Sequence, residues 1–279
     1  MSGRRKHPDA TSYRADVGPR LFKFIESKAD SKVENTILHA LAVFSFAVEH
    51  LAEDATRHQD VLKKTGVLLV LMQDALRGLL GAQRVLSPVT SACLARNILE
   101  TYCNLRFIYR SDEPAKWADR FARFEAVEKV LHENHRPPGE PSLLSTGERE
   151  RILREAPEWF GNKGKVVPHW TADMDLKSLK TMAGRVGLAD VHHRLYFIGS
   201  KFMHGSPLLA NAYSGAGQLG ALGNTDMCSQ LSLLATGLAI RAIEETVEFY
   251  GGPNIDEDLL QWERGVLAAN GVSGTGVAP

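Results

Sequence analysis

Apolar residues recur at helical spacing along most of this chain. Four long stretches carry an apolar residue every three or four positions, over residues 31–53, 60–84, 88–110 and 226–250. A period of 3.6 residues is typical of amphipathic helices that bury one side. No stretch alternates apolar and polar residues as a half-buried strand does, and no repeat of fixed period is present. The pattern predicts an all-α fold.

Shorter helices are indicated between these stretches. Ser111 to Pro114 resembles a helix start, and an apolar stripe follows it as far as Leu131. Ser145 and Glu148 form a capping-box pattern for a short charged helix that ends near Ala156. Further helical pieces are expected over residues 176–183, 188–203 and 255–269. The sequence therefore predicts a bundle of about six to eight helices.

Long irregular segments separate the predicted helices. Residues 134–144, 161–173 and 205–224 are rich in glycine, proline and polar residues without periodicity, so we expect surface loops there. Both ends of the chain lack an apolar pattern. We therefore expect a disordered arm over residues 1–18, one helical bundle domain over residues 19–270, and a disordered tail over residues 271–279.

Charge and composition narrow the function classes. Lysine and arginine total 33 and so do aspartate and glutamate, with a pI near 7.2, so no global field attracts nucleic acid or an anionic membrane. Any nucleic-acid contact must be local. The most apolar windows, residues 67–80 and 231–243, are too short or too polar to span a bilayer, and no secretory signal is present. We expect a soluble protein with no membrane association.

The cysteine pattern points to a reducing compartment. Cys93 and Cys103 lie about 15 Å apart if their helix is regular, which is too far for a disulfide, and Cys228 is the only other cysteine. No spacing of cysteine and histidine indicates zinc. We therefore expect reduced thiols in a cytoplasmic protein, with neither a metal nor a cofactor.

One polar row is set into the otherwise apolar helix of residues 88–110. Arg96, Glu100 and Asn104 step by four and so lie on one side of that helix, between two apolar flanks. The charges should therefore face protein rather than water. Since a buried unpaired charge costs several kcal/mol, partners are required elsewhere in the chain.

A second polar row follows the helix of residues 188–203. Tyr196, Ser200 and His204 also step by four, and His193 returns close to the same line. Their hydroxyl and imidazole groups could satisfy the first row, so we predict that the two helices face one another. His192 and His193 point about 100° apart and make a poor metal pair.

Two interpretations of the paired rows remain open. The rows are either a buried polar layer that fixes the register of the bundle, with Arg96 and Glu100 as an i, i+4 salt bridge, or a functional site. His204 precedes Gly205 at the end of a helix, where solvent can reach it. Arginine beside histidine, tyrosine and serine is a set that can hold a phosphate and move a proton, and Lys201 can join the anion site.

At these two helices the sequence resembles a bacterial and phage all-α family of unknown function. The resemblance covers roughly residues 31–250. It rests on Ala95-Arg96-x3-Glu100-x3-Asn104 followed by Arg106-Phe107-Ile108-Tyr109, and on Tyr196-x3-Ser200-Lys201-x2-His204-Gly205-Ser206. More distantly the arrangement is similar to the HEPN superfamily of helical bundles, many of which are metal-independent endoribonucleases of toxin and phage-defence systems.

The HEPN resemblance implies RNA as a partner and a metal-independent cleavage. HEPN enzymes carry an arginine four to six residues before a histidine, whereas His204 follows Lys201 and Arg194, so Arg96 would supply the arginine from the other helix. His204 would act as general acid or base at a ribose 2′-hydroxyl, Arg96 would hold the phosphate, and Glu100 would orient Arg96. The expected substrate-binding residues are Glu100, Asn104, Tyr196, Ser200, Lys201 and His193.

Further alternatives stay open at the level of sequence. A homodimer would double the local positive charge around a phosphate site. The runner-up function is a non-enzymatic interaction or regulatory protein whose polar rows are purely structural. A small-ligand pocket lined by the same rows is a third hypothesis.

Overall fold

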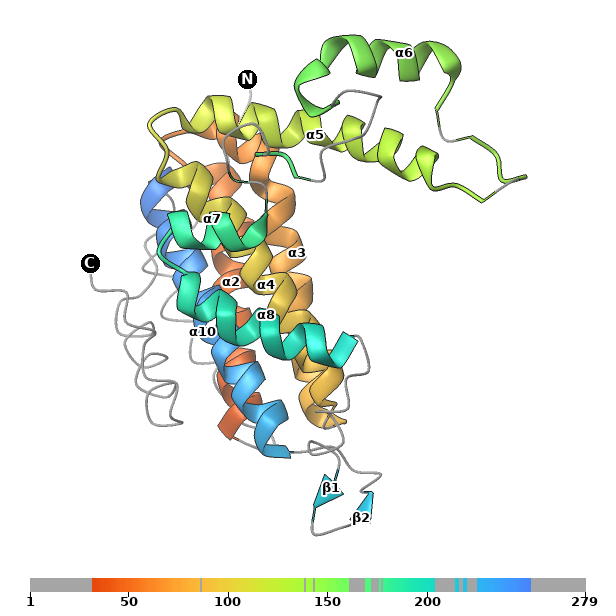
Figure 1. The fold of residues 1–279 in the computed structure, drawn as a ribbon. Helices are drawn as coiled ribbons and strands as arrows, with labels where there is room; N and C mark the ends of the chain where they lie inside the picture. The colour runs from red at the N-terminus through yellow and green to blue at the C-terminus, as the bar shows by residue number, and fades with distance from the viewer. Residues whose placement is uncertain are drawn as a thin grey trace, which may run out of the picture.

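The helical bundle expected from the sequence is present in the computed structural model of the chain (Figure 1). The structure describes residues 32–85, 87–137, 139–142, 144–160, 169–171, 176, 178–203, 214–215, 218–219 and 225–251. The expected arm, the terminal helix over residues 255–269, and the tail lie outside the described residues, and so does His204. The described part is an all-α bundle, which confirms the predicted fold class.

Four long helices form the core of the bundle. They are α2 (Lys32–Asp54), α3 (Gln59–Arg84), α4 (Pro88–Tyr109) and α10 (Thr225–Tyr250), and each begins and ends within one residue of its predicted bounds. Their apolar stripes meet at Phe44, Leu76, Leu99 and Ile243, among many others. Each such fully buried side chain stabilises the fold by about 2 kcal/mol. The stripes read from the sequence are therefore the core.

Helix α4 is the central element of the bundle. It packs against α3 and α10 on its inner sides and against α5, α7 and α8 on its outer side. Its start is fixed locally, because the Ser87 hydroxyl accepts a hydrogen bond from the Thr90 backbone N–H (3.3 Å) and Pro88 occupies the first turn. The polar row of α4 therefore lies where the outer helices cover the bundle.

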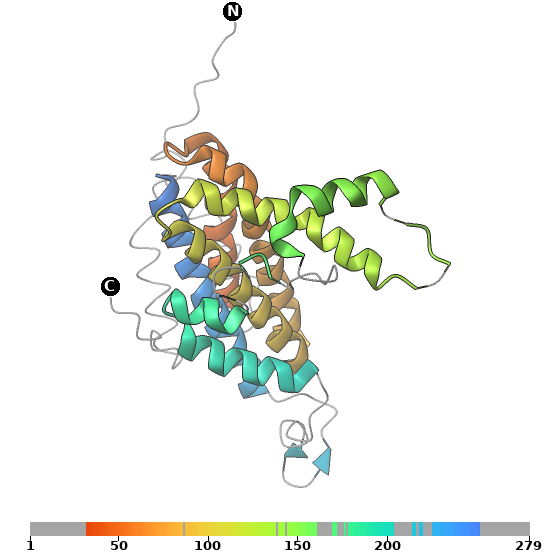
Figure 2. The same cartoon turned by 45° about the horizontal axis from the view of Figure 1, so that its top comes forward.

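Two helices form an arm that leaves the bundle. Helix α5 (Pro114–Asn134) crosses α3 and α4 at one end of the bundle, and α6 (Thr146–Glu155) packs back on the projecting half of α5 (Figures 1 and 2). The predicted capping box of Ser145 and Glu148 is present at the start of α6. A short 3-10 turn, η1 (Pro157–Trp159), leads the chain back toward α4.

The outer face of α4 is covered by α7 (Leu179–Arg185) and α8 (Ala189–Met203). Contact between α8 and α4 confirms the prediction that these two helices face one another. Figure 1 shows that α8 crosses α4 rather than running alongside it. Only a short part of the polar row on α4 can therefore meet α8.

One short hairpin departs from the sequence-based expectation. Strands β1 (Ser214–Gly215) and β2 (Gln218–Leu219) pair antiparallel, with Ser214 opposite Leu219. Residues 205–224 were expected to form a surface loop, and this hairpin within them was not anticipated. Strands of two residues are too short to show an alternating pattern, so the sequence carries no signal for them.

The end of α10 shows why the chain turns there. Gly251 has a φ of +62°, and a Cβ at that position would clash with the Thr56 hydroxyl, so glycine is required where α10 ends. The Tyr250 carbonyl accepts hydrogen bonds from the backbone N–H groups of Thr56 (3.1 Å) and Arg57 (3.0 Å). These bonds tie the end of α10 to the connection between α2 and α3.

Helix α3 is more apolar than the sequence analysis allowed. Among the described helices it alone has the length and hydropathy of a segment that could cross a membrane, with a mean hydropathy of 1.3 over its most apolar window. Half of that window is buried inside the protein. The remainder includes Val67, Val70 and Leu71, which are 56%, 46% and 46% exposed.

Candidate functional site

Arg96 connects the two polar rows. Its Nε donates to Glu100 Oε1 at 2.7 Å, which confirms the predicted i, i+4 salt bridge. Its guanidinium carbon also lies 4.5 Å from the centre of the Tyr196 ring, a distance at which the ring face attracts a cation. Arg96 and Glu100 of the first row and Tyr196 of the second are therefore brought together.

The cluster around Arg96 is half-exposed. The side chains of Arg96 and Glu100 are 23% and 39% exposed, and Tyr196 is 36% exposed. The expectation that these charges face protein rather than water is met only in part, because α8 crosses α4 and leaves the polar row partly uncovered. The charges keep contact with solvent, and a ligand can reach them.

The histidine beside Arg96 is His192, and its ring is buried. It stacks on the Tyr196 ring with centroids 4.8 Å apart, whereas the expected His193 is exposed. Burial lowers the pKa of His192 below its usual value of 6.5, and the nearby Lys180 adds to this. His192 is therefore neutral at pH 7. The sequence contained a signal for it, since His192 lies four residues before Tyr196.

Among the described side chains, Asn104 pairs with Trp170. Its side-chain carbonyl oxygen accepts a hydrogen bond from Trp170 Nε1 at 3.0 Å, whereas the side chains of Ser200 and His204, which were expected to pair with the first row, lie outside the described part. Near the end of α4, Phe107 packs edge-on against Trp117 of α5 and against Trp170. Trp170 is itself buried, which also corrects the expectation of a surface loop there.

The Trp170 segment is held in place by α5 and η1. The Trp170 carbonyl accepts hydrogen bonds from Arg120 Nε (2.8 Å) and from Trp159 Nε1 (3.1 Å). The guanidinium carbon of Arg120 lies 4.6 Å from the centre of the Trp159 ring. These interactions are all made at long sequence separation, so the helical pattern gives no signal for them.

His169, next to Trp170, is the second histidine with a lowered pKa. Its Nδ1 lies 2.7 Å from the Thr171 hydroxyl and 3.3 Å from the Thr171 backbone nitrogen, so Thr171 fixes the ring. Burial lowers the pKa of His169, and the carboxylate of Glu100 partly offsets this. The imidazole is therefore neutral at pH 7, and within the described part of the chain no group is recorded as bonding to its Nε2.

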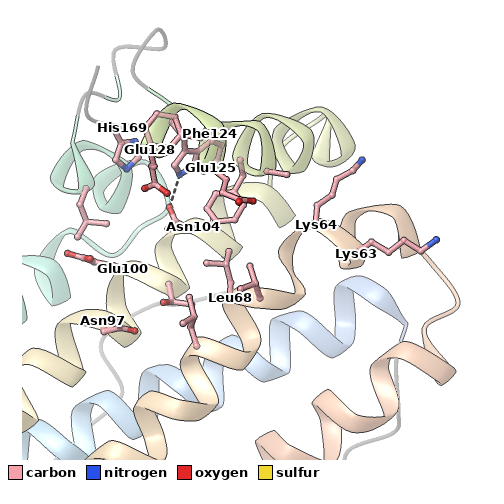
Figure 3. A pocket seen from close by; sticks show the side chains of 17 residues that line it. Lys63, Lys64, Leu68, Asn97, Glu100, Asn104, Phe124, Glu125, Glu128 and His169 are labelled. Carbon is pink, nitrogen blue, oxygen red and sulfur yellow. Dashed lines mark hydrogen bonds between the residues drawn. The ribbon is translucent and has the colours of Figure 1, made fainter. Parts of the chain in front are cut away.

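A pocket of about 800 Å³ lies between α3, α4, α5 and the Trp170 segment (Figure 3). Its apolar lining consists of Val67, Leu68, Leu71, Phe121, Ala122, Phe124, Trp170 and Leu179. Its polar lining consists of Lys63, Lys64, Asn97, Glu100, Thr101, Asn104, Glu125, Glu128 and His169. Glu100 therefore contributes both to the Arg96 cluster and to the pocket. Glu100 and Asn104 were predicted as site residues from the sequence, whereas the pocket wall formed by α3 and α5 was not.

Glu128 has the most perturbed carboxyl group of the pocket. Burial raises its pKa, and the neighbouring carboxylate of Glu125 raises it further. Glu125 is paired with Lys129 (2.8 Å), and Glu100 is paired with Arg96. Among the described residues no cation is recorded as pairing with Glu128. A hydrogen-bond donor placed in the pocket would stabilise its ionised form.

The remaining expected site residues are only partly described. Ser200 and Lys201 belong to α8, but their side chains lie outside the description, and His204 lies beyond the described end of the helix.

Cys93, Cys103 and Cys228 are all free thiols, as the spacing predicted. Burial raises the pKa of Cys103 to about 12, so this thiol is not reactive at neutral pH. Among the described residues, no three His, Cys, Asp or Glu side chains lie close enough together to coordinate a metal ion.

Chemically, the Arg96 cluster suits the binding of an oxyanion. An arginine that is already oriented by a carboxylate and a ring loses little side-chain freedom when it binds a phosphate. Neutral imidazoles nearby can accept a proton at pH 7. The adjoining pocket offers an apolar floor with polar groups at its edge, which is typical of a ligand site.

Comparison with known proteins gives one match. No curated protein and no solved structure matches the chain. The model of one protein family matches a segment of the chain that begins at the end of α3 and includes α4, α5, α6, α7 and α8. This segment contains both helices of the Arg96 cluster. The chain is thus similar, over residues 84–217, to the Family of unknown function (DUF5677).

Proposed function

We propose that the face formed by α4 and α8 binds single-stranded RNA and cleaves it without a metal ion. The observation that carries this proposal is the partly exposed Arg96, held between the Glu100 carboxylate and the Tyr196 ring. A guanidinium so oriented matches the two oxygens of a phosphodiester, and its partial exposure leaves room for the strand. The net charge of the chain is zero, so the attraction must come from this local arrangement.

The proposed reaction is an internal transfer at phosphorus. His204 takes the proton of the ribose 2′-hydroxyl, and the 2′ oxygen attacks the phosphorus atom. The bond between phosphorus and the 5′ oxygen breaks, that oxygen takes a proton from water and leaves as a 5′-hydroxyl, and His204 returns its proton to the solvent. The products are a strand ending in a 2′,3′-cyclic phosphate and a strand beginning with a 5′-hydroxyl. Arg96 stabilises the charge that develops on the phosphate oxygens.

Cleavage of a labelled RNA in excess EDTA tests this proposal. Wild type should produce cyclic-phosphate ends, whereas Arg96→Ala and His204→Ala should each lower the rate by a factor of about 100 or more. Arg77→Ala is the matched control, because Arg77 is also an exposed arginine paired with a carboxylate, Asp74, on its own helix. The proposal fails if wild type cleaves nothing, or if His204→Ala cleaves as fast as wild type.

A non-enzymatic interaction protein is the second candidate. The observation that favours it is the contact of Arg96 with Tyr196, which fastens α8 to α4 whether or not RNA binds. Under this alternative Arg96→Ala would change no RNA property, and its one effect would be a lower melting temperature. Under the proposed function the same variant also weakens RNA binding and cleavage, so the RNA measurements separate the two candidates.

A further inference from the structure

We propose that the pocket between α3, α4 and α5 binds one nucleotide, and that it prefers a base with an exocyclic amino group. The proposal rests on the proposed function, because it makes the pocket the base-binding part of the same RNA site. It adds a specificity that the Arg96 cluster alone does not have, since an arginine on a phosphate does not distinguish bases.

The position of the pocket is the first argument. Glu100 lines the pocket and also holds Arg96 at 2.7 Å, so the pocket begins where the proposed phosphate site ends. Asn97, one residue after Arg96, lines it too. A strand whose phosphate lies on Arg96 can therefore place an adjacent base in the pocket. A volume of about 800 Å³ is within the range of small-ligand sites.

The chemistry of one end of the pocket is the second argument. Glu100, Glu128 and His169 lie together at that end in Figure 3. Carboxylates accept hydrogen bonds from amino groups of bases, and they repel the carbonyl oxygens of uracil. Because the carbonyl of Asn104 accepts from Trp170, its amide nitrogen is left to donate to a ring nitrogen.

The opposite end of the pocket carries positive charge. Lys63 and Lys64 of α3 lie there, away from Glu100 and Glu128 (Figure 3). Lys64 is paired with Asp119 of α5 at 2.6 Å, and Glu128 lies about 13 Å farther along the same helix. Between the two ends the lining is apolar, so a planar base can lie across it. When one phosphate of the strand lies on Arg96, the lysines can attract the phosphate on the other side of the same nucleotide.

Two sources of this ligand share the same chemistry, a free nucleotide and a nucleotide unit of an RNA strand. Isothermal titration of the full chain with 5′-mononucleotides tests the first source. AMP should bind about tenfold more tightly than the purine nucleotide that lacks only the 6-amino group, and GMP more tightly than IMP. Short oligomers of A and of U, measured by fluorescence anisotropy, test the second source, and the A oligomer should bind more tightly.

A pair of matched variants locates the binding. Leu71 lines the pocket and Val70 does not, although both lie on α3 and both are 46% exposed. Leu71→Trp fills the pocket and should weaken nucleotide or oligomer binding at least tenfold, whereas Val70→Trp should bind as wild type does. Both variants should keep the wild-type melting temperature, because neither side chain is buried.

The outcomes separate this inference from the proposed function. If RNA binding depends on Arg96 but is unchanged by Leu71→Trp, the pocket inference is wrong and the proposed function stands. If mononucleotides bind in the pocket but RNA does not bind, the inference stands with a free nucleotide as ligand and the proposed function fails. Equal binding of amino and non-amino bases by wild type overturns the specificity, and no binding of either probe overturns the inference entirely.

Discussion

Arg106 is the arginine of α4 that the bundle buries. Its side chain is 3% exposed, its Nη1 donates to the Tyr102 hydroxyl at 3.1 Å, and its Nε lies 3.5 Å from the Glu245 carboxylate of α10. The sequence suggested that Arg96 would be buried and would need a charged partner inside the protein. In the structure it is Arg106 that is buried and has such a partner, Glu245. Removing one partner of such a pair leaves a poorly solvated charge behind.

A pair of substitutions compares the two arginines. Arg106→Met should lower the free energy of unfolding by about 3 kcal/mol, because it removes the buried cation beside the Glu245 carboxylate and leaves the exposed Arg110 (3.0 Å) as its charged partner among the described residues. Arg96→Met should cost about 1 kcal/mol or less, because Arg96 and Glu100 keep contact with water. Urea unfolding of the two variants and wild type measures both values. A larger loss for Arg96→Met than for Arg106→Met would contradict this assignment.

His39 makes stability depend on pH. It is 3% exposed, and burial lowers its pKa from 6.5 to about 4. The unfolded chain therefore takes up a proton near pH 6.5 that the folded chain refuses until about pH 4, so stability is lost as the pH falls through this window. Between pH 7 and pH 5 the loss from this residue should be about 2 kcal/mol.

The variant His39→Gln isolates that contribution. Between pH 7 and pH 5, His39→Gln should lose about 2 kcal/mol less of its free energy of unfolding than wild type does, since glutamine does not titrate in this range. Denaturant unfolding of both proteins at pH 7, 6 and 5 measures this difference. Carboxylates titrate equally in both proteins, so they cancel in the comparison. Identical slopes in the two proteins would show that burial of His39 does not govern the acid response.

At the scale of elements, the periodic pattern located the long helices within one residue, because their burial is one-sided and their ends carry local signals such as Ser87 and Gly251. The salt bridge of Arg96 with Glu100 was predictable for the same reason, since it lies within one helix. The hydrogen bond of Asn104 with Trp170 joins residues 66 positions apart and has no local signal. The pocket depends on the crossing of α5 over α3, which no spacing in the sequence specifies.

The glycines of α3 illustrate the same limit. Gly78 is a real close approach, because a Cβ there would lie 2.9 Å from a terminal carbon of Leu94 on α4. A Cβ at Gly66 or Gly81 would meet nothing within 4 Å. Of these three glycines, Gly78 alone is needed for the close packing of α4 on α3.

This difference predicts opposite responses to alanine. Gly81→Ala should raise the free energy of unfolding by about 0.5 to 1 kcal/mol, because alanine favours the helix and nothing obstructs its methyl group. Gly78→Ala should gain less or lose stability, because Leu94 must shift. Thermal unfolding of the two variants decides the point, and an equal gain at both positions would show that α3 and α4 are not in close contact at Gly78.

At the scale of the whole molecule, the chain has no net charge. Its fold is explained by the packing of apolar helix faces, without a charged face. The half-exposed Arg96 cluster and the pocket share Glu100, and the pocket reaches from α4 to α3 and α5. The segment that is similar to the family of unknown function begins at the last residue of α3, so it includes the Arg96 cluster but not the lysines of α3. An RNA strand that spans both would contact helices inside and outside the matched segment.

The most direct test of the account is the affinity of the protein for a short fluorescent single-stranded RNA, measured by anisotropy at one fixed salt concentration. Wild type and Arg77→Ala should bind with the same dissociation constant, and Arg96→Ala should bind at least about tenfold more weakly, because a charge-assisted contact to phosphate is lost. Equal affinities of Arg96→Ala and wild type, or no binding by wild type, would contradict the claim that the face of α4 and α8 binds RNA.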